Sequence, residues 1–414
     1  MGDPVVVHLF HRDLRLADNG GFAEAVRVAR HLKATVLPLF VFTPQQIDRN
    51  PLKSAPSVQF MVDSLEELAA TVKQAGGKMR FAHGDTVEVL EGIKNLVAVS
   101  EVADYTPFAK KRQTDIKEFC EKRGIQQILT DDIYLTDPGS VLNGTGRTFQ
   151  KFTPFWTTAK KHAIARPEPA PRSIAWALAS LRIPHSLTKP KSVLEGKRMP
   201  LVAEGGRTAG LKCLASVPAD YEQAHDLVTA PTSKLSAHHH FGTVSIRESY
   251  WNAPLKGAAL EAFRRQLYWR DFYGHIMNDF EGLYGVGPYE FQAPKDWRKG
   301  EKEIFTAWSK GETGVPFVDA GIREMLATGF MHNRARLVVA SWLVKDKGVN
   351  WRWGERFFAK HLVDYDPAQN MMNWIWVASV LPFASAPFRR HDPERSAKKA
   401  DPDGAYVEHW LSHN

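Results

Sequence analysis

The chain has 414 residues, of which 43% are hydrophobic and 24% charged, and this length allows two or three domains with large cores. No stretch approaches the roughly 18 uncharged apolar residues of a membrane span, the start MGDPVVV lacks the features of a signal peptide, and two cysteines are too few for a disulfide framework or a four-cysteine metal or iron–sulfur site. The net charge of +8 permits a polyanionic partner, although solubility is the commoner explanation, and we expect an intracellular protein without a membrane partner whose redox chemistry needs an organic cofactor.

The first 130 residues alternate β-rich runs with helical patterns. The β-rich runs cover residues 5–10, 35–42, 78–83 and 95–102, and helical spacing covers residues 57–75 and 109–123. This alternation predicts a doubly wound parallel sheet of about five strands, an α/β domain over residues 1–130. Neither GxGxxG after the first strand nor GxxxxGK(S/T) occurs in the chain, which argues against a Rossmann nucleotide site and a P-loop.

Prolines interrupt the pattern over residues 131–200, which we interpret as a linker, ordered in part around the aromatic residues between Phe149 and Trp156. Beyond residue 201, apolar residues recur at helical spacing through residues 258–277, 318–327 and 335–344. The fold class is therefore α/β plus all-α, with a helical domain over residues 201–414.

Three adjacent histidines, His238 to His240, raise the possibility of a metal site. Adjacent residues point to different sides of a helix or strand, and no cysteine or carboxylate lies at ligand spacing from them. We therefore expect no metal.

The most unusual segment is residues 364–376, DYDPAQNMMNWIW, which mixes acids, amides and tryptophans. Ten of the twelve tryptophans lie between Trp251 and Trp410. Concentrated indoles can line a flavin or nucleobase pocket or pass electrons to a buried acceptor, although core packing explains any single one equally well. We expect the function in the C-terminal half.

Read in order, these segments resemble the DNA photolyase/cryptochrome family, most closely the class I cyclobutane pyrimidine dimer photolyases, from residue 5 to about residue 411. The motifs that carry the resemblance are HLFHRDLRLADN (8–19), FTPFW (152–156), TSKLSAHHHFGTVS (232–245), RRQLYWRDFY (264–273), GETGVPFVDAGIREMLATGFMHNRAR (311–336), WRWGERFF (351–358) and DYDPAQNMMNWIWVAS (364–379). Any one motif could arise by chance, but their order and spacing are specific.

The resemblance implies an FAD bound inside the helical domain. The family's cofactor contacts correspond to Tyr221, Thr232, Ser233, Lys234, Leu235, Ser236, Phe263, Arg336, Asp364, Asp366 and Asn370. Hydroxyl and N–H groups at a helix N-terminus suit a pyrophosphate, although residues 232–236 could equally be a plain N-cap. Arg336 and Asp364 resemble the family's ion pair over the isoalloxazine, and such a pair alone is more often structural.

Asn370 matches the position that faces flavin N5, where a neutral amide suits both protonation states. Photolyases resemble this chain in having Asn there, whereas plant-type cryptochromes favour Asp and insect-type ones Cys, so Asn370 favours repair. Trp374, Trp351 and Trp297 fall where the family places its electron-transfer chain. Trp297 is the weakest match, because the spacing to Trp308 is one residue longer than in relatives.

The resemblance also implies a lesion pocket with DNA contacts at Gln266, Trp269, Arg270, Asn333, Arg334, Leu337, Trp376 and Arg389. Trp269 and Trp376 match the two indoles that stack on a flipped pyrimidine dimer, and photolyases are a well-known case of base flipping. Three positions depart from the family: Gln266 replaces a usual Glu, Leu337 a usual Met, and His225 a frequent Arg. An amide cannot supply the proton that a carboxyl group can, which puts repair efficiency and lesion class in doubt.

The sequence therefore predicts a light-driven, FAD-dependent deoxyribodipyrimidine photo-lyase, a carbon–carbon lyase that acts on DNA with cyclobutane pyrimidine dimers. A cryptochrome-type blue-light photoreceptor without repair is the main alternative, and a family member that binds flavin or single-stranded DNA without turnover is a third. Repair of (6-4) lesions ranks lower, because Asn333 and Leu337 stand where that subclass has a histidine pair and His332 should point elsewhere.

Three further expectations follow. The α/β domain could hold an antenna chromophore near residues 43–44 and 105–110, and both methenyltetrahydrofolate and 8-hydroxy-5-deazaflavin stay open. The C-terminal ADPDGAYVEHWLSHN resembles the family's penultimate element, so the helical domain is expected to be short at its C-terminus. We expect a monomer, in either the cytoplasm or the nucleus.

Overall fold

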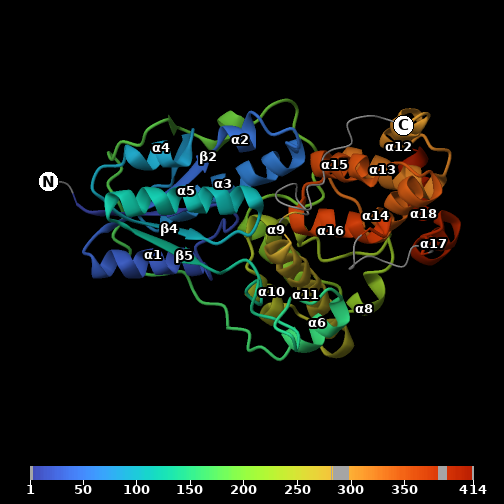
Figure 1. The fold of residues 1–414 in the computed structure, drawn as a ribbon, viewed down its shortest axis with the longest axis horizontal. Helices are drawn as coiled ribbons and strands as arrows, with labels where there is room; N and C mark the ends of the chain where they lie inside the picture. The colour runs from blue at the N-terminus through green and yellow to red at the C-terminus, as the bar shows by residue number, and fades with distance from the viewer. Residues whose placement is uncertain (1–2, 281, 283–297, 381–388, 413–414) are drawn as a thin grey trace.

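The computed structural model describes residues 3–280, 282, 298–380 and 389–412. The sheet domain lies at one end of the molecule and the C-terminal helices at the other, with α9 to α11 and α6 between them (Figure 1). The predicted fold class, an α/β domain followed by helices, is confirmed.

The sheet has six strands in the order β5-β4-β1-β2-β3-β6. The first five are parallel, as predicted, and β6 pairs antiparallel with β3. The prediction missed β6 because a strand of two residues shows no periodicity. The strands are β1 (Val5–Leu9), β2 (Thr35–Phe42), β3 (Arg80–His83), β4 (Leu96–Val102), β5 (Gln126–Thr130) and β6 (Ser186–Leu187).

Both faces of the sheet are buried, as a parallel sheet requires. Val6 and Val36 pair across β1 and β2 and pack in a core with α1 (Gly20–His31) and α3 (Ala55–Gln74). The next pair, Val7 and Leu37, faces the other side and packs in a core with α4 (Thr86–Glu91) and α5 (Pro107–Arg123). The short α2 (Pro44–Ile47) follows β2. Period-two alternation along the strands thus builds the two cores.

The predicted linker is more closely attached to the sheet than the sequence indicated. It contains α6 (Phe152–Ala159), β6 and the 3-10 helix η1 (Pro190–Val193). Its Ile183 and Val193 are buried in the two cores of the sheet domain. The predicted boundaries at residues 130 and 200 stay predictions.

Every element described after residue 201 is helical. The predicted helical patterns correspond to α11, α13 and α14. The elements are α7 (Arg207–Ala215), α8 (Tyr221–Ala224), α9 (Ser236–Phe241), α10 (Ile246–Asn252), α11 (Gly257–Asp279), α12 (Glu301–Lys310), α13 (Pro316–Thr328), α14 (Asn333–Ser341), the π-helix η3 (Trp342–Asp346), α15 (Trp351–His361), α16 (Pro367–Ala378), α17 (Pro393–Ala400) and α18 (Ala405–Ser412). Among the described helices, none combines the length and apolar character needed to cross a bilayer.

Buried ion pairs join the sheet domain to the helical domain. Arg247 of α10 bonds Asp18 at 3.0 Å and Asp132 at 2.5 Å, and Arg15 also pairs with Asp132. The Arg15 and Asp18 partners both come from the HRDLRLADN motif. This motif is therefore a domain-joining element, since removing one partner of a buried pair leaves the other charge uncompensated.

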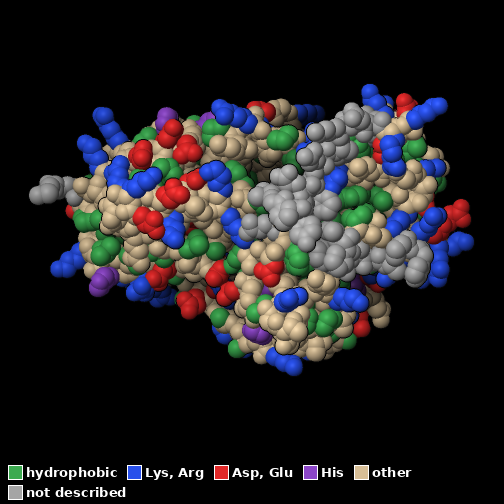
Figure 2. Space-filling view, viewed as in Figure 1, with side chains coloured by type: hydrophobic (Ala, Val, Ile, Leu, Met, Phe, Trp, Pro, Cys, Tyr) green, Lys and Arg blue, Asp and Glu red, His purple; other side chains and the backbone are tan. Residues whose placement is uncertain are grey.

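Basic side chains do not form one uniform surface. On the face in Figure 2, Lys and Arg side chains lie along the outer edge of the helical domain, near α12 and α17, with acidic side chains among them. The sequences of both helices mix the two signs, with Glu301 and Glu303 in α12 and Glu394 in α17. The net charge of +8 thus does not by itself locate a polyanion surface.

Candidate functional site

The segment at residues 364–376 forms α16 and the turn before it. Asp366 is the N-cap and accepts a hydrogen bond from the Gln369 N–H at 3.1 Å, and Pro367 occupies the first helical turn, where a missing N–H costs nothing. Asn370 and Trp374 are four residues apart and share one face of the helix, whereas Trp376 lies on another. The helix therefore presents its polar and aromatic residues to two different surroundings.

The predicted Arg336–Asp364 ion pair is formed. Arg336 Nη2 lies 2.9 and 3.0 Å from the two carboxylate oxygens of Asp364, and Arg336 Nε donates to the Met331 carbonyl at 2.8 Å. Asp364 is buried and Arg336 partly buried. The pair is thus fixed in orientation rather than free at the surface.

Asp366 bonds to residues that the sequence analysis did not assign to the site. Arg12, from the loop after β1, donates to the Asp366 carboxylate and to the His240 carbonyl, and His240 Nδ1 lies 3.5 Å from Asp366. Burial alone would raise the pKa of Asp366, but the Arg12 charge and the His240 contact hold it well below its usual range. Arg12 therefore connects the sheet domain to both α9 and α16.

Residues 232–236 precede α9 but do not cap it with a side-chain hydrogen bond. The helix α9 begins at Ser236, its N-cap is Leu235 without a side-chain capping bond, and Lys234 has a left-handed φ of 50°. The Ser233 side chain instead lies close enough to the Tyr221 hydroxyl to oppose in part the rise that burial causes in the Tyr221 pKa. A left-handed backbone is costly for a lysine, and functional sites are one of the places where it occurs. The alternative to a phosphate contact, a plain side-chain N-cap, is therefore not present at α9.

Tyr221 and Phe263 lie together in a buried cluster. Their rings are 5.3 Å apart at 82°, and Leu235 belongs to the same cluster. Burial raises the pKa of Tyr221 to about 12. The structure thus brings together three predicted cofactor residues that are separated by up to 42 positions in the chain.

Asn370 is held by a residue that the sequence analysis missed. Its Nδ2 donates to Glu355 Oε1 at 2.9 Å and to the Glu355 carbonyl at 3.2 Å. Burial raises the pKa of Glu355 to about 7, although the bond from Asn370 partly opposes this shift. Since Nδ2 is engaged by α15, the amide oxygen is the group that Asn370 can offer to a ligand.

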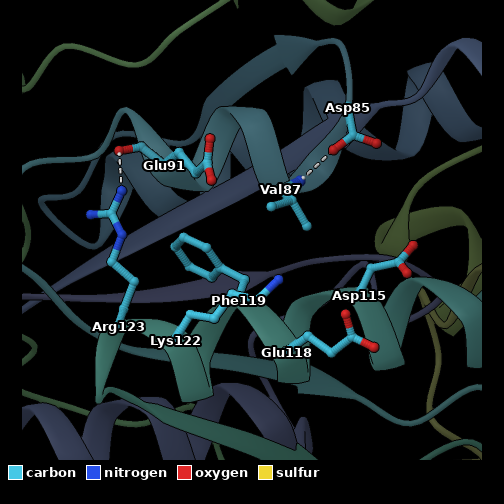
Figure 3. A pocket seen from close by; sticks show the side chains of 8 residues that line it. All are labelled: Asp85, Val87, Glu91, Asp115, Glu118, Phe119, Lys122 and Arg123. Atoms are coloured by element: carbon cyan, nitrogen blue, oxygen red, sulfur yellow. Dashed lines mark hydrogen bonds between the residues drawn. The ribbon is translucent and has the colours of Figure 1, made fainter.

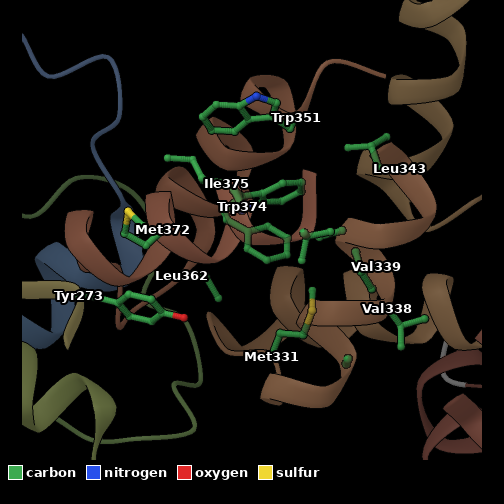
Figure 4. Close-up of a cluster of buried hydrophobic side chains, with 14 of the residues drawn as sticks. Tyr273, Met331, Val338, Val339, Leu343, Trp351, Leu362, Met372, Trp374 and Ile375 are labelled. Atoms are coloured by element: carbon green, nitrogen blue, oxygen red, sulfur yellow. The ribbon is translucent and has the colours of Figure 1, made fainter. Parts of the chain in front are cut away.

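Trp374 and Trp351 lie in one large buried cluster (Figure 4). Trp374 is 2% exposed, and its ring centroid is 5.1 Å from that of Phe358 and 6.4 Å from that of Trp308. Gly354 of α15 makes room for it, because a Cβ there would lie 2.1 Å from Trp374 Cη2. The predicted third member, Trp297, lies outside the described residues.

Trp269 and Trp376 lie on two helices that contact each other. One turn after Trp269, the Tyr273 hydroxyl of α11 donates to Asn373 Oδ1 of α16 at 3.3 Å, and Asn373 is three residues before Trp376. Phe152 of the FTPFW motif stacks on Trp269 with centroids 3.7 Å apart at 7°. One face of Trp269 is therefore covered by Phe152. Gln266 is partly buried three residues before Trp269, on the same side of α11.

The predicted DNA residues of α14 begin at its N-terminus. Asn333 is exposed, and Arg334 donates through Nε and Nη2 to Asp226. Leu337 packs against the core of the helical domain. His332 is the N-cap of α14; it is buried, whereas Asn333 is exposed, and it accepts a bond from the Arg334 N–H at 3.1 Å.

The remaining three predicted positions differ in exposure. Arg389 is exposed and lies over the Trp376 ring, 5.0 Å from its centroid. His225 stacks on Tyr221 at 5.3 Å. Arg270, however, is 5% exposed, and its guanidinium donates to the carbonyls of Ile133 and His239. The predicted contact of Arg270 with DNA phosphates is therefore not supported, because its donors serve the domain interface.

The side chains of the three adjacent histidines have three different partners. His238 bonds Thr243 Oγ1 at 2.8 Å, His239 bonds Ser249 Oγ at 2.7 Å, and His240 faces Asp366. Among the described residues, no group of three or more His, Cys, Asp or Glu side chains is arranged to hold a metal.

A separate pocket of about 350 Å³ lies between α4 and α5, remote from α16 (Figures 1 and 3). The dashed lines in Figure 3 mark two hydrogen bonds at this pocket: the Val87 N–H donates to Asp85, and Arg123 donates to the Glu91 carbonyl. Its carboxylates and cations are solvated, and it contains none of the predicted site residues. We do not assign it to the site.

The sequence matches two family models, DNA photolyase over residues 6–173 and the FAD binding domain of DNA photolyase over residues 263–413. Curated relatives named deoxyribodipyrimidine photo-lyase include one from Synechococcus sp., 32% identical over 97% of this chain and 86% of the relative. Another, from Streptomyces griseus, is 34% identical over 98% of this chain and 89% of the relative. The chain belongs to the DNA photolyase/cryptochrome family.

Solved structures of this family agree with the fold. An archaeal photolyase from Sulfolobus tokodaii, described with two FAD molecules, superimposes with a TM-score of 0.85 and 32% identity, covering 98% of this chain and 90% of that one. A cryptochrome from Synechocystis sp. superimposes with a TM-score of 0.87 and 25% identity, covering 100% and 89%. The family includes both repair enzymes and cryptochromes, so membership alone does not select between them.

The residues of the site fit an FAD. The fixed Arg336–Asp364 pair, the Asn370 amide oxygen and the Tyr221 hydroxyl beside its apolar cluster are the kinds of group that an FAD needs. A few polar groups in largely apolar surroundings are typical of cofactor sites.

Proposed function

We propose that the protein is a light-driven, FAD-dependent deoxyribodipyrimidine photo-lyase that splits cyclobutane pyrimidine dimers in DNA. The observation that carries this proposal is the arrangement of Trp269 and Trp376 on contacting helices, with Asn370 six residues before Trp376 on α16. The name shared by the curated relatives over nearly the whole chain supports it.

The two indoles hold the lesion. Trp269 is backed by Phe152, so only its other face can accept a pyrimidine ring, and Trp376 provides the second surface. Base–aromatic stacking contributes about 1–3 kcal/mol per base. Phe152 also excludes water from the covered face of Trp269, which keeps the stacking surface rigid.

When bound, FAD supplies the light-excited electron donor that opens the cyclobutane ring and recovers the electron afterwards. Asn370 orients its amide oxygen through the bonds of Nδ2 to Glu355, and the Arg336–Asp364 pair fixes a charge beside the cofactor site. Gln266 can orient a base through its amide but supplies no proton. We therefore expect a lower repair yield than a carboxyl group at position 266 would give.

Trp374 and Trp351 are proposed to deliver electrons that restore the reduced cofactor. Both are buried in the same cluster, where the absence of water limits the reorganisation that accompanies charge transfer. Trp297 remains the proposed surface member.

An antenna chromophore in the sheet domain is a separate proposal. Thr43 and Tyr105 follow the carboxyl ends of β2 and β4, the edge at which parallel sheets bind ligands. Thr43 Oγ1 is buried and has no hydrogen-bond partner among the described residues. The absorption spectrum of extracted cofactor distinguishes methenyltetrahydrofolate from 8-hydroxy-5-deazaflavin.

A cryptochrome-type photoreceptor is the second candidate, favoured by Gln266 and Leu337 at positions where dimer repair enzymes usually have Glu and Met. The deciding experiment uses full-length protein with chemically reduced FAD and an oligonucleotide that contains one thymine cyclobutane dimer. Blue light should remove the lesion, while a dark control and an oligonucleotide with a (6-4) lesion should stay unchanged. Normal FAD binding and photoreduction without loss of the dimer would replace the repair proposal with the photoreceptor.

The DNA partner and the oligomeric state belong to the same proposal. Duplex that contains a dimer should bind the face of Asn333, Arg334 and Arg389 as a complex with one protein monomer. Because phosphate contacts release counterions, this affinity should fall as salt rises.

A further inference from the structure

His391 lies beside Trp376 without having been part of any predicted site. Its ring centroid is 5.8 Å from that of Trp376, with the planes at 43°. Its backbone N–H donates to Ser341 Oγ of α14 at 3.0 Å, which fixes the chain at this point. The imidazole is therefore held at the side of one of the two indoles that are proposed to stack on the lesion.

The His391 Nε2 atom is buried and has no hydrogen-bond partner among the described residues. Leaving such an atom unpaired destabilises the folded protein. In native proteins, an unsatisfied buried polar group calls for an explanation, and a ligand is one of them. If packing against Trp376 were the only role of residue 391, a phenylalanine would fill it without leaving a buried nitrogen unpaired.

The surroundings of His391 point to a nucleic acid rather than to a metal or an acid. Burial and the positive charges of Arg389 and Arg334 lower its pKa, so the ring is neutral near pH 7. A neutral imidazole has one N–H donor and one acceptor nitrogen. The edge of a thymine offers the matching groups, carbonyl oxygens and an N3–H, and the flanking arginines suit its phosphates.

We propose that His391 is a substrate-contacting residue that hydrogen-bonds through Nε2 to the edge of the flipped pyrimidine held against Trp376. This inference rests on the proposed repair function. It assigns a polar contact to the Trp376 side of the lesion, opposite the contact that Gln266 makes beside Trp269. Discrimination between damaged and undamaged DNA then depends on both ends of the pocket.

Two substitutions separate this role from packing. His391→Phe keeps an aromatic ring against Trp376 but removes both nitrogens, whereas His391→Gln keeps an amide nitrogen near the position of Nε2. Binding of each variant, with FAD bound, is measured to an oligonucleotide with one thymine dimer and to the same oligonucleotide undamaged. Melting temperature and FAD content report folding.

His391→Phe should weaken binding of the damaged oligonucleotide about 3- to 10-fold, as expected for one hydrogen bond, without changing binding of the undamaged one. His391→Gln should recover most of the loss. Equal affinities of wild type and His391→Phe for the lesion, or equal losses for both oligonucleotides, would overturn the inference. If His391→Phe fails to fold, His391→Leu takes its place in the same measurements. Wild-type discrimination between the two oligonucleotides in His391→Leu would then overturn the inference.

Failure of the underlying function looks different. A wild-type protein that neither prefers the damaged oligonucleotide nor repairs it under blue light contradicts the repair proposal itself, whatever the variants do. A wild type that repairs the dimer, combined with an unaffected His391→Phe, contradicts only the role of His391.

Discussion

The two tryptophans of α16 stand two residues apart and meet opposite surroundings. Trp374 is enclosed by hydrocarbon and aromatic rings, with Phe358 and Trp308 as neighbours. Trp376 is partly buried, and its ring contacts the Arg389 guanidinium and the His391 ring. A rotation of about 200° along the helix separates them. One residue type thus serves two purposes: an indole in a dry cluster suits electron transfer, and an indole beside cations suits stacking with nucleobases.

The surroundings also differ in how tightly they are built. On the Trp374 side, two residues of α15 contact α16 directly. Gly354 lies so close to the Trp374 ring that a methyl group would not fit, and Glu355 accepts hydrogen bonds from Asn370. On the Trp376 side, the contacts include the Arg389 side chain and the His391 ring. We therefore expect substitutions on the first side to alter stability and photochemistry, and those on the second to alter DNA binding.

The largest expected effect separates the two indoles directly. Trp374→Phe should abolish photoreduction of oxidised FAD while leaving dimer repair by chemically reduced FAD largely intact. Trp376→Ala should do the reverse and weaken lesion binding by about 1–3 kcal/mol, the worth of one base stack. Transient absorption and binding titrations provide the two measurements. Loss of both activities in Trp374→Phe would mean that this residue only packs.

Glu355 tests the Trp374 side through pH. Its pKa in the folded protein is about 7, above the ordinary value of 4.5, so the folded state keeps a proton that the unfolded state has lost. The contribution of Glu355 to the free energy of unfolding should therefore be highest at low pH and fall by about 3 kcal/mol as pH rises from 4.5 to about 7.

Glu355→Gln should remove this contribution. Asp271, whose pKa is also raised to about 7 by burial, titrates in both proteins and cancels in their difference. Denaturant titrations across this range give the comparison. If the free energies of unfolding of wild type and variant changed with pH in parallel, Glu355 would not titrate between pH 4.5 and about 7 in the folded protein.

Gly354→Ala tests the space beside Trp374. The added methyl would lie 2.1 Å from Trp374 Cη2, so the indole must move, at a cost of about 1–3 kcal/mol. Thermal unfolding should show the loss, and photoreduction should slow. Gly144→Ala is the matched control, since nothing lies within 4 Å of a Cβ there. Equal melting temperatures for the two variants would show that Trp374 is loosely held.

Gln266→Glu tests the lesion side. A carboxyl group can share a proton with the electron-rich dimer, so the repair yield per absorbed photon should rise. The gain should stay well below the ~10²- to 10⁴-fold of a positioned proton donor in a rate-limiting step, because return of the electron competes. Lesion binding should hardly change. A near-zero yield that stays unchanged would favour the photoreceptor.

The smallest effect concerns Asp226, which pairs with Arg334. The Arg334 side chain is 39% and that of Asp226 50% exposed, so the pair contributes only about 0.2–1 kcal/mol. Asp226→Asn should free Arg334 for a phosphate and tighten binding of damaged and undamaged DNA to a similar, few-fold extent. Glu222→Gln, an exposed neighbouring acid, is the control. Weaker binding in Asp226→Asn would mean that the aspartate positions Arg334 for DNA.

Local periodicity predicted most of the fold, because the strands and helices are long and buried on regular faces. It missed β6, which depends on pairing with β3. The resemblance led to Arg336, Asp364 and Asn370, whose types and spacing form motifs. It could not find Glu355 or Arg12, which matter through contacts with Asn370, 15 positions away, and with Asp366, 354 positions away.

The error at Arg270 has the same origin. An arginine beside a predicted stacking tryptophan suggests a phosphate contact, yet this one lies at the domain interface and donates to two backbone carbonyls. Whether a cation faces solvent or carbonyl groups is decided by the packing of the two domains. No local sequence pattern contains that information.

The bond between Arg12 and Asp366 also limits the order in which the protein can fold during synthesis. The two residues are 354 positions apart, so at 5–20 residues per second a ribosome needs roughly 20–70 s to supply the second after the first. Asp104, only 92 positions after Arg12, becomes available much sooner and can hold the guanidinium in the meantime. The sheet domain can thus fold early with its arginine already oriented, and loading of the cofactor has to wait for one of the last helices to leave the ribosome.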